Sequence, residues 1–146
     1  MTSSTLTVDT PQISWQAVQT ALSAASAKAQ ALGVQVNIAL TDGSGVMVGF
    51  LRMNGAPLHS IDIALDKAYT AASFGLPTSQ WTEALKHHSP AVGQGLVMRP
   101  RFVAFGGGCP IVHASHRIGA IGVSGGSESQ DEEIAQAGLD ALNLKP

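Results

Sequence analysis

Two short apolar runs rich in glycine, close to the C-terminus, constrain the fold more than any other part of this chain. The runs are Gly107-Gly108-Cys109-Pro110-Ile111 and Ile118-Gly119-Ala120-Ile121-Gly122-Val123-Ser124-Gly125-Gly126, and Gln130-Asp131-Glu132 follows as a capped helix start. This spacing predicts a hairpin of short strands that leads directly into a helix. Such a corner leaves backbone N–H groups facing an open space, where they bind a small anion or a carboxylate. We therefore expect a ligand at this corner.

The composition is that of one domain without a nucleic-acid or membrane partner. With 146 residues and a formal net charge of −2, the chain is long enough for a core and carries no basic footprint. Charged residues make up 12% of the chain and hydrophobic residues 45%, so part of the apolar surface is expected to be buried between subunits. We expect a homo-oligomer that binds a small molecule.

Basic and cysteine residues are sparse, and their positions bear on localisation and on metal binding. The first basic residue is Lys28, so no signal peptide with a basic start is predicted, and no apolar run reaches the length of about 18 residues that a membrane span needs. Cys109 is the single cysteine, which excludes an internal disulfide and a multi-cysteine zinc site; its expected role is that of a small buried hydrophobic residue. The prediction is a cytoplasmic protein with no metal site.

Apolar periodicity predicts one α+β domain in which helices pack on an antiparallel sheet. The element order is α-β-β-α-α-β-β-β-α, and hairpins without crossover helices indicate antiparallel pairing. The predicted helices are 14–32, 60–74, 79–88 and 130–142, and the predicted strands are 34–40, 46–53, 102–105, 109–114 and 117–124. Residues 1–12 are rich in Ser and Thr and are predicted to form a disordered leader before a domain at 13–144.

Cap and turn residues mark where several of these elements begin and end. Ser14 is the predicted N-cap of the first helix, and Gly33 is its predicted stop. Asp42 is predicted to shape the turn between the first two strands. Ser129 and Glu132 fit a capping box at the start of the last helix.

Three segments together carry a resemblance to a known family. They are Asp42-Gly43-Ser44-Gly45 with Phe50-Leu51-Arg52-Met53, then Ile63-Ala64-Leu65-Asp66-Lys67-Ala68 with Thr70-Ala71, and finally Gly107-Gly108 through Ile121-Gly122-Val123-Ser124-Gly125 to Gln130-Asp131-Glu132. In this order and spacing they resemble the GlcG/HbpS-like haem-binding family, which includes the C-terminal domain of PduO-type proteins. The resemblance covers roughly residues 14–142.

This resemblance implies a five-stranded antiparallel sheet with flanking helices, assembled into homo-oligomers. It also implies binding of haem or a corrinoid, while other members sit in catabolic operons and have enzymatic or unassigned roles. The chain departs from the family at one turn, where the segment His113-Ala114-Ser115-His116-Arg117 replaces a glycine-containing acidic turn. This turn is more basic than the family pattern, which indicates either a different ligand or a different loop.

A haem site needs an axial ligand, most often histidine, and an apolar slot with cations for the propionates. His113 and His116 lie three residues apart near a predicted turn, and they are our candidate axial ligands for the haem that the resemblance implies. The same spacing equally fits exposed histidines of a turn. His87 and His88 lie near a helix end, where positive charge suits the helix dipole.

Arg52 and Lys67 fall on positions that match the family, which implies that both contact the ligand. Lys67 lies at the margin of the buried stripe of its helix, so its ammonium either extends to solvent or points into a cavity and binds a carboxylate. Ser124 and Gly125, at the glycine-rich corner, are predicted to line the same ligand site.

The alternative function is a cofactor-free enzyme that acts on a small carboxylate by hydrolysis, deamination or isomerisation. In that interpretation Arg52 anchors the carboxylate, while Lys67 and Asp131 transfer protons. Asp131 serves there as a general base or orients Lys67. The leading prediction is a binding protein for haem or a related tetrapyrrole, with haem as its candidate cofactor.

Overall fold

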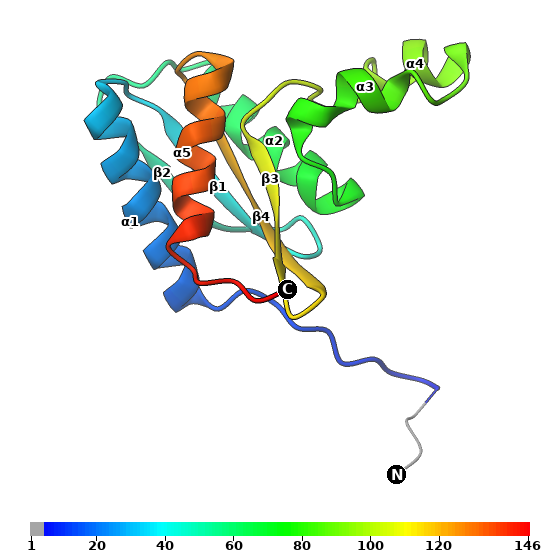
Figure 1. The fold of residues 1–146 in the computed structure, drawn as a ribbon, viewed down its shortest axis with the longest axis horizontal. Helices are drawn as coiled ribbons and strands as arrows, with labels where there is room; N and C mark the ends of the chain where they lie inside the picture. Colours follow the sequence, from blue (N-terminus) through cyan, green and yellow to red (C-terminus); the bar gives the residue numbers. More distant parts are fainter. Residues whose placement is uncertain (1–4) are drawn as a thin grey trace.

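The computed structural model describes residues 5–146, and within them an antiparallel sheet of four strands lies between helices (Figure 1). The strand order is β2-β1-β4-β3, and every neighbouring pair is antiparallel. The elements are α1 (Trp15–Leu32), β1 (Asn37–Asp42), β2 (Met47–Arg52), α2 (Ser60–Phe74), the 3-10 turn η1 (Thr78–Gln80), α3 (Trp81–Leu85), α4 (Pro90–Leu96), β3 (Gly108–His113), β4 (His116–Ser124) and α5 (Glu128–Asp140).

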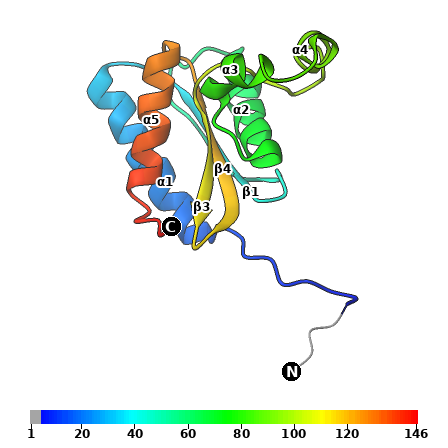
Figure 2. The same ribbon diagram turned by 45° about the vertical axis from the view of Figure 1, so that its right-hand side comes forward.

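The sheet is covered on both faces, which makes three layers. Helices α1 and α5 lie against one face and α2 lies against the other, as the two ribbon views agree (Figures 1 and 2). Aliphatic side chains such as Ile38, Leu40 and Ile121 fill the first interface. The second interface is built from alanines of α2 against Ala39 and Ala120 of the sheet. The small residues let α2 approach the sheet closely.

Two glycines of the predicted hairpin make this close approach possible. A Cβ atom on Gly122 would collide with the backbone carbonyl oxygen of Ala64 in α2, and one on Gly108 would lie 2.6 Å from the carbonyl oxygen of Lys67. Real Cβ atoms do not come this close to backbone, so these strands accept only glycine under α2. The glycine pattern at these two positions is therefore explained by helix–sheet packing.

The prediction of a five-stranded sheet is wrong, because residues 102–105 form no strand. The hydroxyl of Thr70 in α2 accepts a hydrogen bond from the Val103 N–H at 3.1 Å and donates one to the Arg101 carbonyl at 2.9 Å. Backbone groups that a sheet edge would have used are thus bonded to a helix side chain. Phe102 packs edge-on against Phe74 and Trp81, which holds the segment on α2 rather than on β3.

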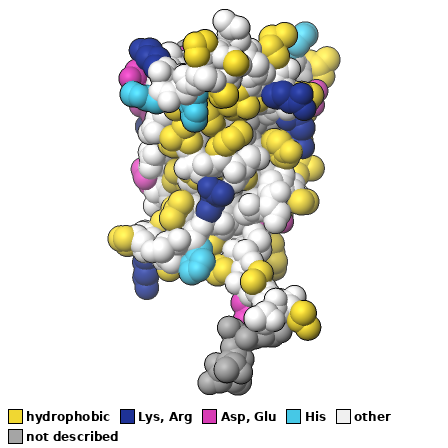
Figure 3. Space-filling model, turned by 90° about the vertical axis from the view of Figure 1, so that its right-hand side faces the viewer, with side chains coloured by type: hydrophobic (Ala, Val, Ile, Leu, Met, Phe, Trp, Pro, Cys, Tyr) yellow, Lys and Arg dark blue, Asp and Glu magenta, His cyan; other side chains and the backbone are white. Residues whose placement is uncertain are grey.

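The second half of α2 leads into a region that also differs from the prediction. The predicted helix 79–88 is the turn η1 followed by the short helix α3, which ends at Leu85. A further helix, α4, was not predicted; the Ser89 hydroxyl caps it by accepting from Val92 N–H at 3.3 Å, and Pro90 occupies its first turn. Figure 3 views the side on which α3 and α4 project, and hydrophobic side chains gather in its upper part with basic side chains at the margins.

Caps confirm some helix ends and correct another. The Ser14 hydroxyl accepts from Ala17 N–H at 3.2 Å, and Gly33 ends α1 in the left-handed region at φ +73°, both as predicted. Asp42 accepts from Ser44 N–H at 2.9 Å and so shapes its turn. The capping box of α5 is formed by Ser127 with Gln130 and not by Ser129 with Glu132.

The predicted leader falls partly outside the described residues, since residues 1–4 are not described. Residues 5–12 are exposed and belong to no helix or strand, and Gln12 accepts a hydrogen bond from Gly43 N–H at 2.7 Å. That residues 1–12 are disordered remains a prediction. Over residues 5–146, none of the helices combines the length and the apolar character needed to cross a bilayer.

Candidate functional site

Lys67 and Asp131 form a buried ion pair at the glycine-rich corner. The Lys67 ammonium donates to Asp131 Oδ2 at 3.1 Å and to the Val123 carbonyl at 2.8 Å. Its Nζ also lies 5.0 Å from the centre of the Phe105 ring. Lys67 is 1% exposed and Asp131 3% exposed. The lysine therefore neither extends to solvent nor points into an open cavity, and it ties α2 to β4 and α5.

The Asp131 carboxylate also accepts hydrogen bonds from the backbone N–H groups that we expected to face an open space. Gly126 N–H donates to Asp131 Oδ1 at 2.9 Å, and Gly125 N–H donates to this carboxylate as well. Gly125 adopts φ +136°, a conformation that favours glycine. The corner does bind a carboxylate, as its sequence indicated, but the carboxylate belongs to the chain itself.

Burial dominates the electrostatics of this pair. Burial lowers the pKa of Lys67 below its ordinary value of 10.5, although the negative charge of Asp131 opposes the shift. Burial likewise raises the pKa of Asp131 above 3.8, although the positive charge of Lys67 opposes it. Glu128 and Glu132 add negative charge near the ammonium. The pair is held by mutual attraction in a place where each charge alone is disfavoured.

Ser124 and Arg52 lie at the same end of the sheet as this pair. Ser124 is opposite Asn37, which is opposite Arg52, so two strand spacings of about 5 Å each separate Arg52 from Ser124. The exposed Arg52 donates to the Ala56 carbonyl at 2.8 Å. The structure thus brings Lys67, Asp131 and Gly125 together, with Ser124 next to them, and leaves Arg52 two strands away. Their roles in ligand binding remain predictions.

His113 and His116 flank the turn between β3 and β4, at the other end of the sheet. Val123 lies seven positions after His116 in β4, which is roughly 23 Å along a strand. His113 Nδ1 accepts from Lys145 N–H at 3.1 Å, so the neutral ring carries its proton on Nε2. His116 Nδ1 lies 2.9 Å from the Ala114 carbonyl and donates to it, which leaves Nε2 free. Of the two, His116 has the tautomer that binds metal through Nε2.

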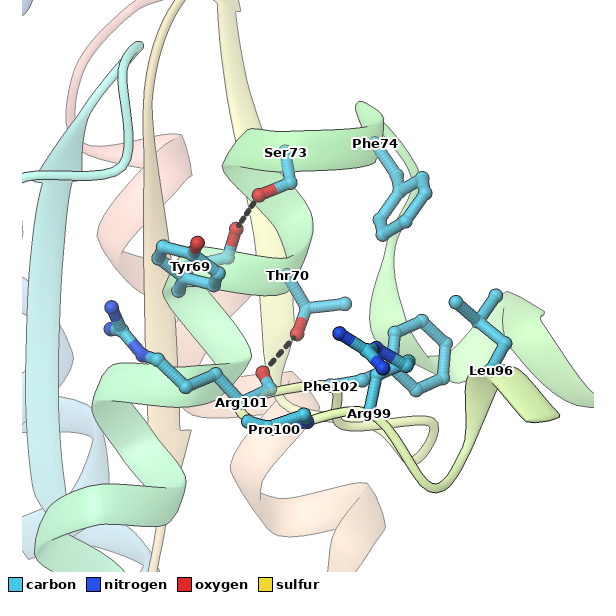
Figure 4. A pocket seen from close by; sticks show the side chains of 9 residues that line it. All are labelled: Tyr69, Thr70, Ser73, Phe74, Leu96, Arg99, Pro100, Arg101 and Phe102. Atoms are coloured by element: carbon cyan, nitrogen blue, oxygen red, sulfur yellow. Dashed lines mark hydrogen bonds between the residues drawn. The ribbon is translucent and has the colours of Figure 1, made fainter.

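A hollow that the sequence did not point to lies between α2 and the segment that follows α4 (Figure 4). Its volume is about 260 Å³, and its walls are mostly aromatic and apolar. It is lined by Tyr69, Thr70, Ser73, Phe74, Leu96, Arg99, Pro100, Arg101 and Phe102. The signal for it in the sequence is the run Arg99-Pro100-Arg101-Phe102, which combines cations with an aromatic ring and overlaps the predicted strand 102–105.

The two arginines of this hollow differ in what they contact. The Arg101 guanidinium stacks on the Tyr69 ring at 3.7 Å and donates to Asp66 at 2.9 Å. Among residues 5–146, no side-chain hydrogen bond or ion pair engages the exposed Arg99. A neighbouring hollow of about 480 Å³, lined by α4, shares Leu96 and Arg99 with the first. Arg99 is therefore a free cation between two apolar hollows.

Cys109 and the remaining acidic and histidine side chains provide no metal centre. Burial raises the pKa of the Cys109 thiol to about 11, and Glu132 adds to the shift, so the thiol stays protonated at neutral pH. No three His, Cys, Asp or Glu side chains are grouped so as to hold a metal ion anywhere in the described chain. Cys109 packs against the hydrophobic core but is only half-buried, whereas the sequence predicts a buried residue.

Comparison with known proteins shows the family of this chain. A family profile described as “Haem degrading protein HbpS-like” matches residues 13–140. The chain belongs to this HbpS-like family. It is 38% identical over 120 residues to a 15.0 kDa protein of Citrobacter freundii from the dhaT-dhaS intergenic region, covering 82% of this chain and 84% of that protein. It is also 32% identical over 133 residues to the corrinoid adenosyltransferase PduO of the same organism, and the match covers 91% of this chain but only 40% of PduO.

Solved structures share the fold along nearly the whole chain. The Klebsiella pneumoniae protein ORFY superposes with a TM-score of 0.88 at 32% identity, and the match covers 99% of this chain and 100% of that one. A complex of PduOC, the PduO C-terminal domain, with haem superposes with a TM-score of 0.84 at 30% identity, covering 92% and 97% of the two chains. The second of these proteins holds haem.

Proposed function

We propose that this protein binds haem or a closely related tetrapyrrole in the hollow between α2 and residues 96–102. Membership of the HbpS-like family and similarity to a haem-bound domain support the ligand. The observation that carries the site is the free guanidinium of Arg99 between two apolar hollows, one of them walled by Phe74 and Phe102. A porphyrin presents the complementary surface, an apolar plane with two carboxylates at one edge.

The size of the site supports a ligand of this class. Pockets for drug-sized ligands measure about 300–1,000 Å³. The hollow at Phe102 measures about 260 Å³ and accepts only part of a macrocycle, but the neighbouring one adds about 480 Å³ on the other side of Leu96 and Arg99. A planar ligand that spans both would place its carboxylates near Arg99.

Three side chains at two places are candidates for the ligand of the haem iron. Tyr69 lines the hollow, and tyrosine is one of the established axial ligands of haem. His116 has a free Nε2 at the hairpin turn but does not line the hollow, and His113 is bonded to Lys145. We propose Tyr69 as the ligand for a haem in the hollow, and the two histidines for a haem at the hairpin. Bound haem would supply an iron centre for redox or ligand chemistry and a visible absorption spectrum.

We further propose that the protein works as a homo-oligomer in the cytoplasm. Sparse surface charge supports the oligomer, as do exposed hydrophobic side chains including Trp15, Val97 and Met98. The alternative of a small-carboxylate enzyme is less well supported, because the polar atoms of Lys67 and Asp131 are bonded to groups of the chain itself.

The test is a titration of the purified haem-free protein with haem, followed by absorbance in the Soret region. We expect saturable binding, weakened about tenfold or more by Arg99→Glu, because a charge contact worth about 1.4 kcal/mol corresponds to a factor of ten. Lys145→Glu is the matched control, since it reverses the charge of an exposed cation that lines neither hollow and should leave the affinity unchanged. Absence of saturable binding to the unmodified protein would overturn the function.

The iron ligand is assigned in the same titration from the shape of the spectrum. Tyr69→Phe should shift the absorption bands of the ferric complex while binding persists through the apolar walls. The double variant His113→Ala/His116→Ala should leave them unchanged. If Tyr69→Phe leaves the bands unchanged and the double histidine variant shifts them, the haem binds at the hairpin and not in the hollow.

A further inference from the structure

The segment 81–100, here called the arm, carries α3 and α4 away from the three layers of the fold. Both ribbon views show α4 standing apart from the sheet and its covering helices (Figures 1 and 2). Helix α4 has seven residues, none of which is buried. A helix this short is not stable in water by its own hydrogen bonds and depends on packing. In the single chain, only Gly93 and Leu96 of α4 are partly covered.

The arm exposes apolar side chains beyond the usual scatter of a surface. Val92 and Val97 are about two-fifths exposed, and Met98 is 81% exposed. Figure 3 shows hydrophobic side chains gathered on this side of the molecule. Exposed apolar side chains gathered on one side of a molecule are typical of an interaction surface.

Charge distinguishes the tip of the arm, residues 86–98, from the helix α5. The tip has no acidic residue, and neither does any position from 84 to 127, whereas Lys86, His87 and His88 supply basic groups; Lys86 and His87 lie 3.1 and 3.7 Å from Glu83 of α3. Helix α5 has five acidic residues and no Lys or Arg. The two surfaces therefore have opposite character within one chain.

An acidic hollow of about 490 Å³ lies at the root of the arm, between η1 and α5. It is lined by Pro77, Ser79, Gln80, Cys109, Ser129, Glu132, Glu133 and Gln136. Glu133 is 3.9 Å from Lys28, while no ion pair or hydrogen bond of the described chain engages the Glu132 carboxylate. This hollow combines acidic groups with apolar surface, which is the complement of the tip.

We propose that a second copy of this chain covers the arm, with two arms packed antiparallel about a two-fold axis. Because the acidic hollow and the basic tip lie at opposite ends of one arm, this arrangement places each tip at the root of the other arm. The interface is then self-complementary, as a two-fold contact requires. It rests on the homo-oligomer proposed above, and it would also enclose the hollows next to α4.

The mass of the full-length protein in solution, by light scattering or sedimentation, tests this interface. We expect a dimer or a multiple of it, and we expect Met98→Asp to weaken association at least tenfold. Leu58→Asp is the matched control, because Leu58 is 74% exposed and lies outside the arm. Neither change buries a charge in the single chain, so circular dichroism should show both variants folded.

Charge reversal then tests the pairing of tip and root. Lys86→Glu and Glu132→Lys should each weaken association, and the two together in one chain should restore it. A monomeric wild type would overturn both the homo-oligomer and the interface. An oligomer that tolerates Met98→Asp and both single reversals would overturn the interface alone.

Discussion

Lys67 shows how a single residue joins separate elements of this fold. Its helix lies on one face of the sheet, yet its ammonium contacts β4 and the first turns of α5. Removing either partner of such a buried pair leaves the other as an uncompensated buried charge, whereas removing both charges does not. The pair is thus strongly coupled, even though burial opposes each charge.

This coupling predicts the stability of three variants in urea unfolding. Lys67→Met and Asp131→Asn should each cost about 3–5 kcal/mol of unfolding free energy. The double variant should cost less than either, because the Asn oxygen still accepts from Gly126 N–H and no charge stays buried. Lys86→Met is the control at an exposed pair and should cost at most about 1 kcal/mol. Additive losses in the double variant would contradict the coupling.

The pKa directions of the pair fix how this comparison changes with pH. A carboxyl whose pKa is raised in the folded state, as for Asp131, loses stabilisation as pH rises above its unfolded value of 3.8. An ammonium whose pKa is lowered, as for Lys67, gains stabilisation as pH rises toward 10.5. Both effects lower the stability of the wild type relative to the double variant at pH values well above 3.8 and well below 10.5. Unfolding measured from pH 4 to 10 should therefore show a minimum of relative stability within this range.

At the residue scale, the sequence predicted partners better than it predicted exposure. In the alternative function Asp131 is a general base or orients Lys67; the structure shows the two residues in contact, and either role remains a prediction. The sequence did not predict that the Lys67–Asp131 pair is buried, nor that Asp131 itself binds the backbone of the Gly125-Gly126 corner. Both depend on how closely α2 packs on the sheet, a tertiary distance that no local pattern encodes.

Among the elements, the hairpin of β3 and β4 has an unusual turn. Ala114 and Ser115 both adopt positive φ, at 50° and 67°. This two-residue turn suits the twist of the strands, but it favours Asn and Gly at these positions because side chains with a Cβ are strained there. Ala114 and Ser115 therefore make the folded protein less stable than Asn and Gly would at these positions.

Replacing this turn tests that account. Ala114→Asn/Ser115→Gly should raise the free energy of unfolding by about 1 kcal/mol, because the new residues tolerate positive φ. His113 and His116 are kept, so the fold and any haem spectrum should stay the same. Thermal and urea unfolding measure the gain, and a variant no more stable than the wild type would show that the turn is unstrained.

The helices with clear caps were predicted well, and the irregular segments were not. Ser14 and Gly33 fixed the ends of α1, and the predicted helix 60–74 matches α2. Residues 102–105 have strand-like composition but are bonded by Thr70, a residue thirty positions earlier, which local periodicity does not reveal. Helix α4 was missed because its glycines outweighed the Ser89-Pro90 start signal.

For the molecule as a whole, the resemblance of three segments predicted the family, and the family profile confirms it. The proposed haem site could not be predicted from the sequence, because its walls come from α2 and from residues some thirty positions later. The proposed interface was equally hidden, since it depends on the arm standing away from the core. Both features belong to the tertiary arrangement and to no single motif.

The most direct test of the proposed function is a crystal structure of the haem-loaded protein, with anomalous data collected at the iron edge. We expect one iron peak in the hollow lined by Phe74 and Phe102, with a haem carboxylate near Arg99. An iron peak beside His116 at the β3–β4 turn would contradict that placement. A crystal grown with excess haem that shows no iron peak would contradict haem binding itself.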